Sequence, residues 1–142
     1  PLESRRVFRT LLGERHNRIV TTLAKERRAV AARWGVRNLP STDEWLDRFA
    51  GTMAGTMARP VPHPNQADDL IRCATMGSLV PLQSAAQLAE LPVPATSAMI
   101  ELAHQSIGGD LLHAGRRLDN MGFVNTDLDG IRTQLDAMTV AT

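Results

Sequence analysis

Apolar residues along this 142-residue chain recur mostly at spacings of three and four, which is the period of an amphipathic helix. No stretch shows a convincing alternation of apolar and polar residues, the pattern typical of a β-strand. The pattern therefore predicts an all-α fold, a compact multi-helix domain of about six to seven helices. We expect one domain over residues 1–142, with the proline-rich stretch 58–66 as a connector within it.

The first helical pattern spans residues 2–34, and Gly13 is the point at which an interruption is expected. Gly35 follows the pattern directly, as is typical of a helix C-terminus. A second helix is predicted to begin at Ser41. Ser41 and Glu44 have the spacing of a capping box, in which hydroxyl and carboxylate accept each other's backbone N–H groups.

Two further helices are predicted over residues 66–75 and 78–91, with Pro81 in the first turn of the second. The second is apolar nearly all round, so we expect it to be central. A helix over residues 95–107 follows and ends at Gly108-Gly109. Its residues expected to face the core are Met99, Ile100, Leu102 and Ala103.

The last part of the chain is predicted to form short helices. Asp110 is expected to cap one that reaches His113. A final helix, capped by Asn125 or Thr126, is expected to extend to about Met138.

Charge is distributed unevenly. Residues 1–37 carry ten basic and three acidic residues, a net charge of +7, and residues 38–142 carry six basic and twelve acidic residues, a net charge of −6. Acidic residues lie among the basic ones without interleaved aromatics, so we expect no binding to nucleic acid. The opposite charges favour packing of the two halves on each other, or a symmetric homodimer.

No apolar run is long enough to cross a membrane, and no signal-peptide pattern begins the chain, so a cytoplasmic location is expected. The lone Cys73 cannot form an internal disulfide and is expected to be a small buried hydrophobe.

Few motifs carry chemistry of their own. No glycine-rich phosphate loop follows a strand pattern, and no nucleophile elbow occurs. Glu101-x-x-His104 and Asp110-x-x-His113 each resemble part of a di-iron site, but they lie close together across Gly108-Gly109 and lack partner carboxylates. We therefore expect no metal site. His104 is the strongest candidate for acid–base chemistry, because its helix has a strongly apolar face.

Several short motifs occur in an order shared with a known family and cover nearly the whole chain. They are residues 26–31 followed by Gly35 and the helix from Ser41, then 78–81, 91–94 with the helix from Ser97, 109–110, 115–118 and 121–123. In this order they resemble the C-terminal helical domain of NAD(P)-dependent opine dehydrogenases of the octopine and nopaline type. The resemblance implies a domain that follows a Rossmann domain, closes over its cofactor, and holds an amino acid and a 2-oxo acid for reductive condensation.

The sequence departs from the family pattern at the catalytic residues. The nucleotide-binding half is not in this chain, so the resemblance implies that NAD or NADP binds only through a partner Rossmann domain. The family's catalytic histidine lies upstream of the matching residues. Counting back from Ser78 without gaps, its acidic partner falls on Ala74. If the motif is shortened, Arg72 corresponds to the arginine that binds the oxo-acid carboxylate.

Three functions stay open. The first is the substrate-binding and dimerising helical domain of an opine-dehydrogenase-like oxidoreductase, with a Rossmann-domain subunit as partner. The second is a stand-alone, redox-free descendant that binds, cyclises or isomerises an amino-acid-derived or imine-like molecule in specialised metabolism. The third is a non-catalytic interaction module that uses the basic face of residues 5–37.

The candidate site residues come from three of the predicted helices and from the start of a short one after Gly115. His104 is the expected acid or base, and Arg72 the expected ligand of a substrate carboxylate. Thr75 and Ser78 are expected to orient the substrate. Arg116, at a helix start after a glycine, is a further candidate for a ligand carboxylate.

Overall fold

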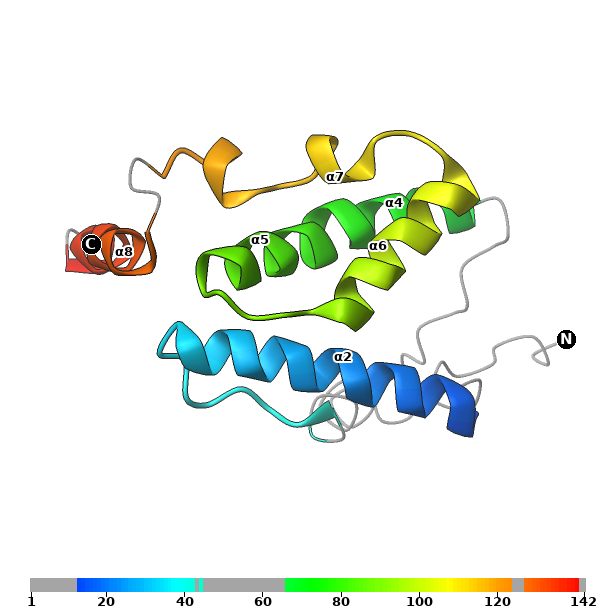
Figure 1. Ribbon diagram of the computed structural model, residues 1–142, viewed down its shortest axis with the longest axis horizontal. Helices are drawn as coiled ribbons and strands as arrows, with labels where there is room; N and C mark the ends of the chain where they lie inside the picture. Colours follow the sequence, from blue (N-terminus) through cyan, green and yellow to red (C-terminus); the bar gives the residue numbers. More distant parts are fainter. Residues whose placement is uncertain (1–12, 43, 45–65, 124–126, 141–142) are drawn as a thin grey trace, which may run out of the picture.

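The computed structural model describes residues 13–42, 44, 66–123 and 127–140. Every regular element in these ranges is helical and none is a strand, which confirms the all-α fold. The elements are α2 (Glu14–Arg33), α4 (Ala67–Ala74), the π-helical segment η2 (Thr75–Leu79), α5 (Val80–Leu88), α6 (Pro94–Ile107), α7 (Leu111–Ala114), the 3-10 segment η3 (Leu118–Asn120) and α8 (Leu128–Val140) (Figure 1). Because α4, η2 and α5 run on from one another, the described ranges hold slightly fewer separate helices than the sequence pattern predicts for the chain.

Some predicted features lie outside the described residues. They are the start of the first helix before Gly13, nearly all of the helix from Ser41, the connector 58–66 except its last residue, and the caps at Asn125 and Thr126.

The two helices predicted over residues 66–91 are one continuous helix, formed by α4, η2 and α5. Pro81 lies inside it and has no N–H to donate to the preceding turn. The chain widens to π spacing in η2, where the Val80 N–H donates to the Thr75 carbonyl five residues before it. The Met76 carbonyl accepts the N–H of Arg116 at 3.1 Å instead. The π segment thus accommodates the proline and ties this helix to the chain after α7.

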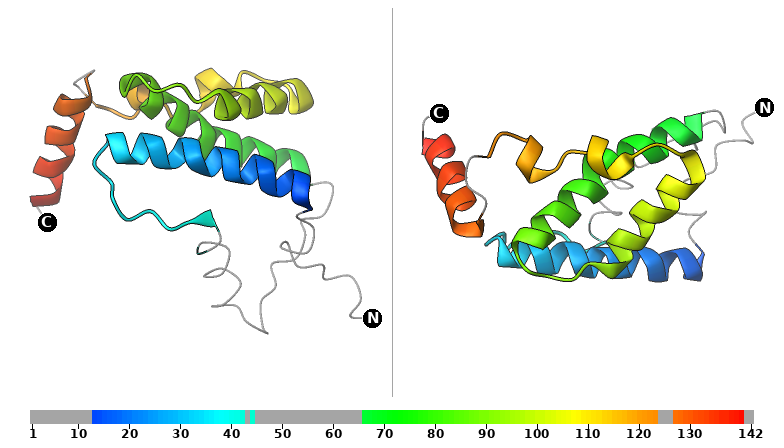
Figure 2. Two further views of the ribbon diagram at one scale, coloured as in Figure 1. Left: turned by 60° about the horizontal axis from the view of Figure 1, so that its bottom comes forward. Right: turned by 45° about the horizontal axis from the view of Figure 1, so that its top comes forward.

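The helices pack in layers around a small core (Figures 1 and 2). The long helix α2 packs against both α5 and α6, and α7 contacts α6 and η2 on the side away from α2. Between α2 and α5 the buried core residues are Val30, Ala86 and Val93, with Trp34 packed against them. The indole N–H of Trp34 donates to the Ala85 carbonyl at 3.1 Å. α8 lies at one end of the molecule (Figure 1).

Glu26 of α2 caps the N-terminus of α6, which has no cap of its own from Val93. The Ala95 N–H donates to Oε1 at 2.7 Å, and the Thr96 N–H and hydroxyl donate to Oε2 at 2.8 and 2.7 Å. Partial burial acts to raise the pKa of Glu26. The hydrogen bonds from Thr96 and Ala95 outweigh it, so the pKa lies below its ordinary value of 4.5.

The local helix-end signals form as predicted. Gly35 has a φ of +85°, and the N–H of Val36 reaches back to the Ala31 carbonyl, as in a Schellman motif. Ser41 and Glu44 exchange both hydrogen bonds of a capping box, at 2.6 and 3.0 Å. Asp110 accepts the His113 N–H at 3.1 Å, which confirms it as the cap of α7.

The cap of α8 differs from the prediction. The side chain of Asp127, the residue just before α8, accepts the Gly130 N–H at 2.6 Å. Asp127 therefore caps α8, while the predicted caps Asn125 and Thr126 lie outside the described residues.

Two predictions of burial are wrong. Leu102 is 62% exposed, whereas Ile100 and Ala103 are buried, because Leu102 lies about 200° around the helix from Ile100. Cys73 is exposed rather than buried. It precedes the buried Thr75 by two residues, which again places it on the opposite side of the helix.

Removing the Glu26 carboxylate is expected to destabilise the fold. The Glu26→Ala variant leaves the buried Thr96 hydroxyl and two backbone donors without an acceptor, which should lower the free energy of unfolding by about 2 kcal/mol. Urea denaturation measures the change. Glu14→Ala, at an exposed glutamate of the same helix, is the control. Equal destabilisation by both variants would contradict the capping role.

The Glu26 contribution should depend on pH in a defined direction. Because its folded-state pKa is lowered, the carboxylate stabilises the protein fully above 4.5, and this contribution is lost as the pH falls through the folded-state pKa. The stability difference between the wild type and Glu26→Gln should therefore shrink from about pH 7 to about pH 3. A difference that stays constant over this range would contradict the assignment.

Candidate functional site

Three of the predicted site residues lie where α4 and η2 meet the end of α6. Arg72 and Thr75 are one turn apart on the continuous helix, and both α4 and η2 pack against α6. His104 lies in the last turn of α6. A Cβ placed on Gly109, just after α6, would be 3.3 Å from Nη1 of Arg72. Arg72 and His104 therefore meet at the Gly108-Gly109 turn.

The Gly108-Gly109 turn holds both groups in place. Its glycines have φ values of +68° and +85°, a left-handed conformation that other residues adopt only with strain. Nδ1 of His104 lies 2.5 Å from the Gly109 carbonyl. Because a carbonyl only accepts, Nδ1 carries the proton, and Nε2 is left as the acceptor of the neutral ring.

The site contains polar groups without partners. Neither the half-buried Arg72 guanidinium nor the Thr75 hydroxyl makes a hydrogen bond to any described residue, although Thr75 is only 2% exposed. Among the described residues, the only buried side-chain polar atom without a hydrogen-bond partner is Nε of Arg27 on α2, so the Thr75 hydroxyl and the Arg72 guanidinium keep access to solvent. An arginine fork and a hydroxyl donor together complement a carboxylate.

Ser78 and Arg116 are less closely joined to this group. Both are exposed, and among the described residues no hydrogen bond or ion pair joins their side chains to Arg72 or His104. Arg116 is held by its backbone N–H on the Met76 carbonyl, which leaves its side chain at the surface.

A carboxylate that the prediction did not place in the site lies beside His104. Asp110 Oδ2 is 2.7 Å from Nδ1 of His113, and both side chains are mostly exposed. The backbone N–H of His113 and then its ring lower the pKa of Asp110 below 3.8, with smaller contributions from the charges of His113 and His104. In the sequence, the Asp110-x-x-His113 spacing could have indicated this carboxylate, but the same spacing also predicts a helix cap.

Three further points of the sequence analysis concern the family's acidic residue, a metal site and a membrane-spanning helix. Ala74, where the family's acidic residue would fall, is exposed on α4. Within the described ranges, no group of three or more histidine, cysteine, aspartate or glutamate side chains is arranged to hold a metal ion. In the same ranges, no helix combines the length and apolarity needed to cross a membrane.

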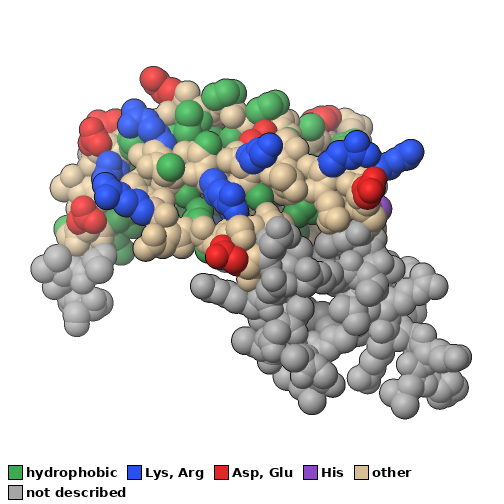
Figure 3. All heavy atoms as spheres, turned by 90° about the horizontal axis from the view of Figure 1, so that it is seen from below, with side chains coloured by type: hydrophobic (Ala, Val, Ile, Leu, Met, Phe, Trp, Pro, Cys, Tyr) green, Lys and Arg blue, Asp and Glu red, His purple; other side chains and the backbone are tan. Residues whose placement is uncertain are grey.

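The basic face of the N-terminal part is only partly described. On α2, exposed basic residues include Arg15, Arg18, Lys25 and Arg28. Seen from the α2 side, lysine and arginine side chains are spread over the surface with acidic and apolar side chains between them (Figure 3). The described part of this face is therefore not one continuous basic patch.

Substitution of the two turn glycines should separate backbone strain from displacement of Arg72. Gly108→Ala adds only strain, since nothing lies within 4 Å of its Cβ, and should cost about 1 kcal/mol. Gly109→Ala adds strain as well and also brings its Cβ to 3.3 Å from Nη1 of Arg72, so it should weaken any binding that depends on Arg72, whereas Gly108→Ala should not. Urea denaturation measures the strain in both variants, and isothermal titration measures the binding. Equal effects of both variants on binding would mean that Arg72 does not pack on the turn.

Comparison with known proteins adds no relative. No family model, no curated protein and no solved structure matches this chain. The fold class therefore rests on the helices themselves, and the function must be argued from the residues around the Gly108-Gly109 turn.

Proposed function

We propose that this chain is the substrate-binding helical part of an opine-dehydrogenase-like oxidoreductase, and that it binds the carboxylate of an amino-acid-derived molecule. The observation that carries the proposal is the group of Arg72, Thr75 and His104. It combines a guanidinium and a hydroxyl that make no hydrogen bond to a described residue with an imidazole whose tautomer is set by a carbonyl. The ordered motif resemblance supports the same substrate class.

Each side chain has one task in this proposal. Arg72 binds the two oxygens of the carboxylate, and Thr75 donates its hydroxyl proton to one of them. Nε2 of His104 faces the substrate amine or imine nitrogen and exchanges a proton with it. Asp110 lies near this ring, since the charge of His104 contributes to the lowered pKa of Asp110.

The described residues do not fit a nicotinamide dinucleotide. They contain no strand followed by a glycine-rich turn, the arrangement that holds its pyrophosphate. We assign these residues no part in hydride transfer. In the proposal, NAD or NADP supplies the hydride from a partner Rossmann domain.

A redox-free function is the second candidate, and Ala74 favours it. The family's carboxylate is replaced there by an exposed methyl group, while Arg72 and His104 both lie against the Gly108-Gly109 turn. Such a protein would bind, cyclise or isomerise an imine-like molecule by proton transfer at His104. Native mass spectrometry of the protein purified from its host separates the two, since only the first requires a co-purifying Rossmann-type chain.

The remaining parts of the proposal come from the sequence. The opposite net charges of the two halves favour a homodimer, and the composition fits a cytoplasmic protein. The non-catalytic interaction module finds less support in the described part of α2, where basic residues are interspersed with acidic and apolar ones.

Arg72→Ala should strongly weaken carboxylate binding without unfolding the protein. Isothermal titration with N-(1-carboxyethyl)alanine and with pyruvate is expected to show at least about tenfold weaker binding, because a charge-assisted bidentate contact is lost. Arg72→Lys should recover only part of the affinity, since an ammonium lacks the fork geometry.

Arg28→Ala, which removes an exposed arginine on α2, is the matched control and should leave the affinity unchanged. Equal weakening by both alanine variants would mean that the loss of one positive charge anywhere on the protein, and not a contact with Arg72, explains the weaker binding. Unchanged binding by Arg72→Ala would exclude the proposed site.

A further inference from the structure

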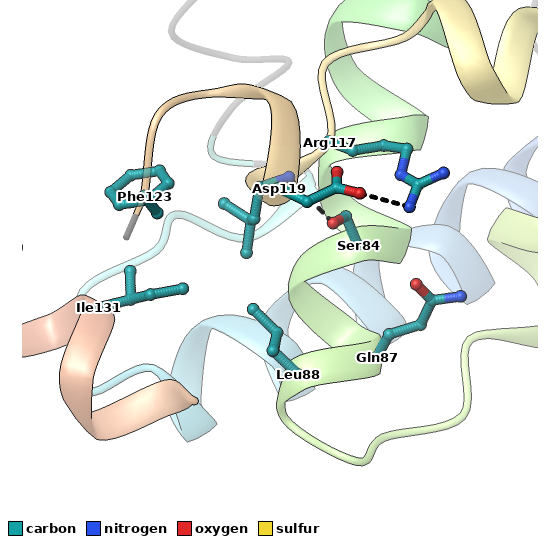
Figure 4. A pocket seen from close by; sticks show the side chains of 8 residues that line it. Ser84, Gln87, Leu88, Arg117, Asp119, Phe123 and Ile131 are labelled. Atoms are coloured by element: carbon teal, nitrogen blue, oxygen red, sulfur yellow. Dashed lines mark hydrogen bonds and ion pairs between the residues drawn. The ribbon is translucent and has the colours of Figure 1, made fainter. Parts of the chain in front are cut away.

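A cavity of about 360 Å³ lies between α5, η3 and α8, away from the Gly108-Gly109 turn (Figure 4). Its volume falls in the range of small-molecule sites. Leu88, at the end of α5, lines it, whereas Arg72 lies 16 residues earlier on the same continuous helix. At the helical rise this separation is about 24 Å, so the cavity and the Arg72 group are distinct.

One side of the cavity is apolar. Leu88, Phe123 and Ile131 come from three different segments and line the hollow, into which Leu88 and Ile131 point (Figure 4). Ile131 is only 1% exposed, so α8 is fixed here by a buried side chain. A molecule in the cavity would contact α5 and α8 together and gain apolar contacts with both.

The other side is polar but electrically compensated. Nη2 of Arg117 is 2.6 Å from Oδ2 of Asp119, so a charged ligand would have to compete with an existing ion pair. Ser84 Oγ accepts the Leu118 N–H at 3.0 Å, which leaves its own proton to donate. The Gln87 amide makes no hydrogen bond to any described residue. These groups offer donors to a neutral acceptor.

We propose that this cavity binds an uncharged, mainly apolar small molecule that carries a carbonyl or amide group. The apolar part lies against Leu88, Phe123 and Ile131. The carbonyl oxygen accepts from the Gln87 amide and the Ser84 hydroxyl. The inference stands independently of the carboxylate site at Arg72.

N-methylbenzamide is the probe, because it combines a flat apolar ring with one amide. A ¹H–¹⁵N NMR titration is expected to shift the amide signals of the residues around the cavity, with a dissociation constant of about 1 mM for a ligand of this size. Benzoate and benzylamine have the same ring with a negative or positive charge. They are expected to bind at least about tenfold more weakly, since the Arg117–Asp119 pair leaves no charge unpaired.

Two variants locate the binding. Gln87→Leu, at an exposed residue, should weaken binding of N-methylbenzamide about fivefold because it removes the amide donor. Gln105→Leu, at an exposed glutamine on α6, and Arg72→Ala should leave the affinity unchanged.

Three results would overturn the proposal. The first is the absence of signal changes at the cavity, as when a segment of the chain or a second copy already fills it. The second is charged probes that bind as tightly as the amide. The third is an unchanged affinity in Gln87→Leu.

Discussion

The carboxylate of Glu26 is the contact on which the rest of the arrangement depends. It joins two helices that are 70 residues apart in the sequence, and it satisfies the first-turn donors of α6 that no local residue caps. Because α6 is fixed at its start against α2, its last turn, with His104 and the glycine turn, has a defined position relative to α4. Glu26, one charged residue of an amphipathic helix, thus fixes the start of α6 and with it the geometry of the candidate site.

The second constraint is the proline inside the long helix. Pro81 follows the π segment η2 and has no N–H to donate, and the Met76 carbonyl, five residues before it, accepts the N–H of Arg116 beyond α7. Gly115 permits this approach, since a Cβ there would lie 2.7 Å from Val80. The hydrogen bond from Arg116 to Met76 therefore holds the chain after α7 against η2, on the same helix that carries Arg72. The contacts of Glu26 with α6 and of Met76 with Arg116 therefore stabilise the fold and also position the candidate site.

Local features were predictable from the sequence, and packing was not. The Gly35 end, the Ser41–Glu44 box and the Asp110 cap depend on residues within one turn, so their patterns identify them. The joined helix depends on how the chain around Pro81 packs, which no local pattern states, whereas the outward Leu102 follows from its position about 200° around the helix from Ile100. The same holds for the site. Arg72 and His104 could each be named from the sequence, but their meeting at Gly109 follows from the packing of α4 on α6.

The most direct test of the central claim is a crystal structure of the protein with N-(1-carboxyethyl)alanine. The account predicts carboxylate oxygens within hydrogen-bond distance of the Arg72 guanidinium and the Thr75 hydroxyl, and the amine nitrogen beside Nε2 of His104. A ligand bound elsewhere, or Arg72 paired with a carboxylate of the protein itself, would contradict the account.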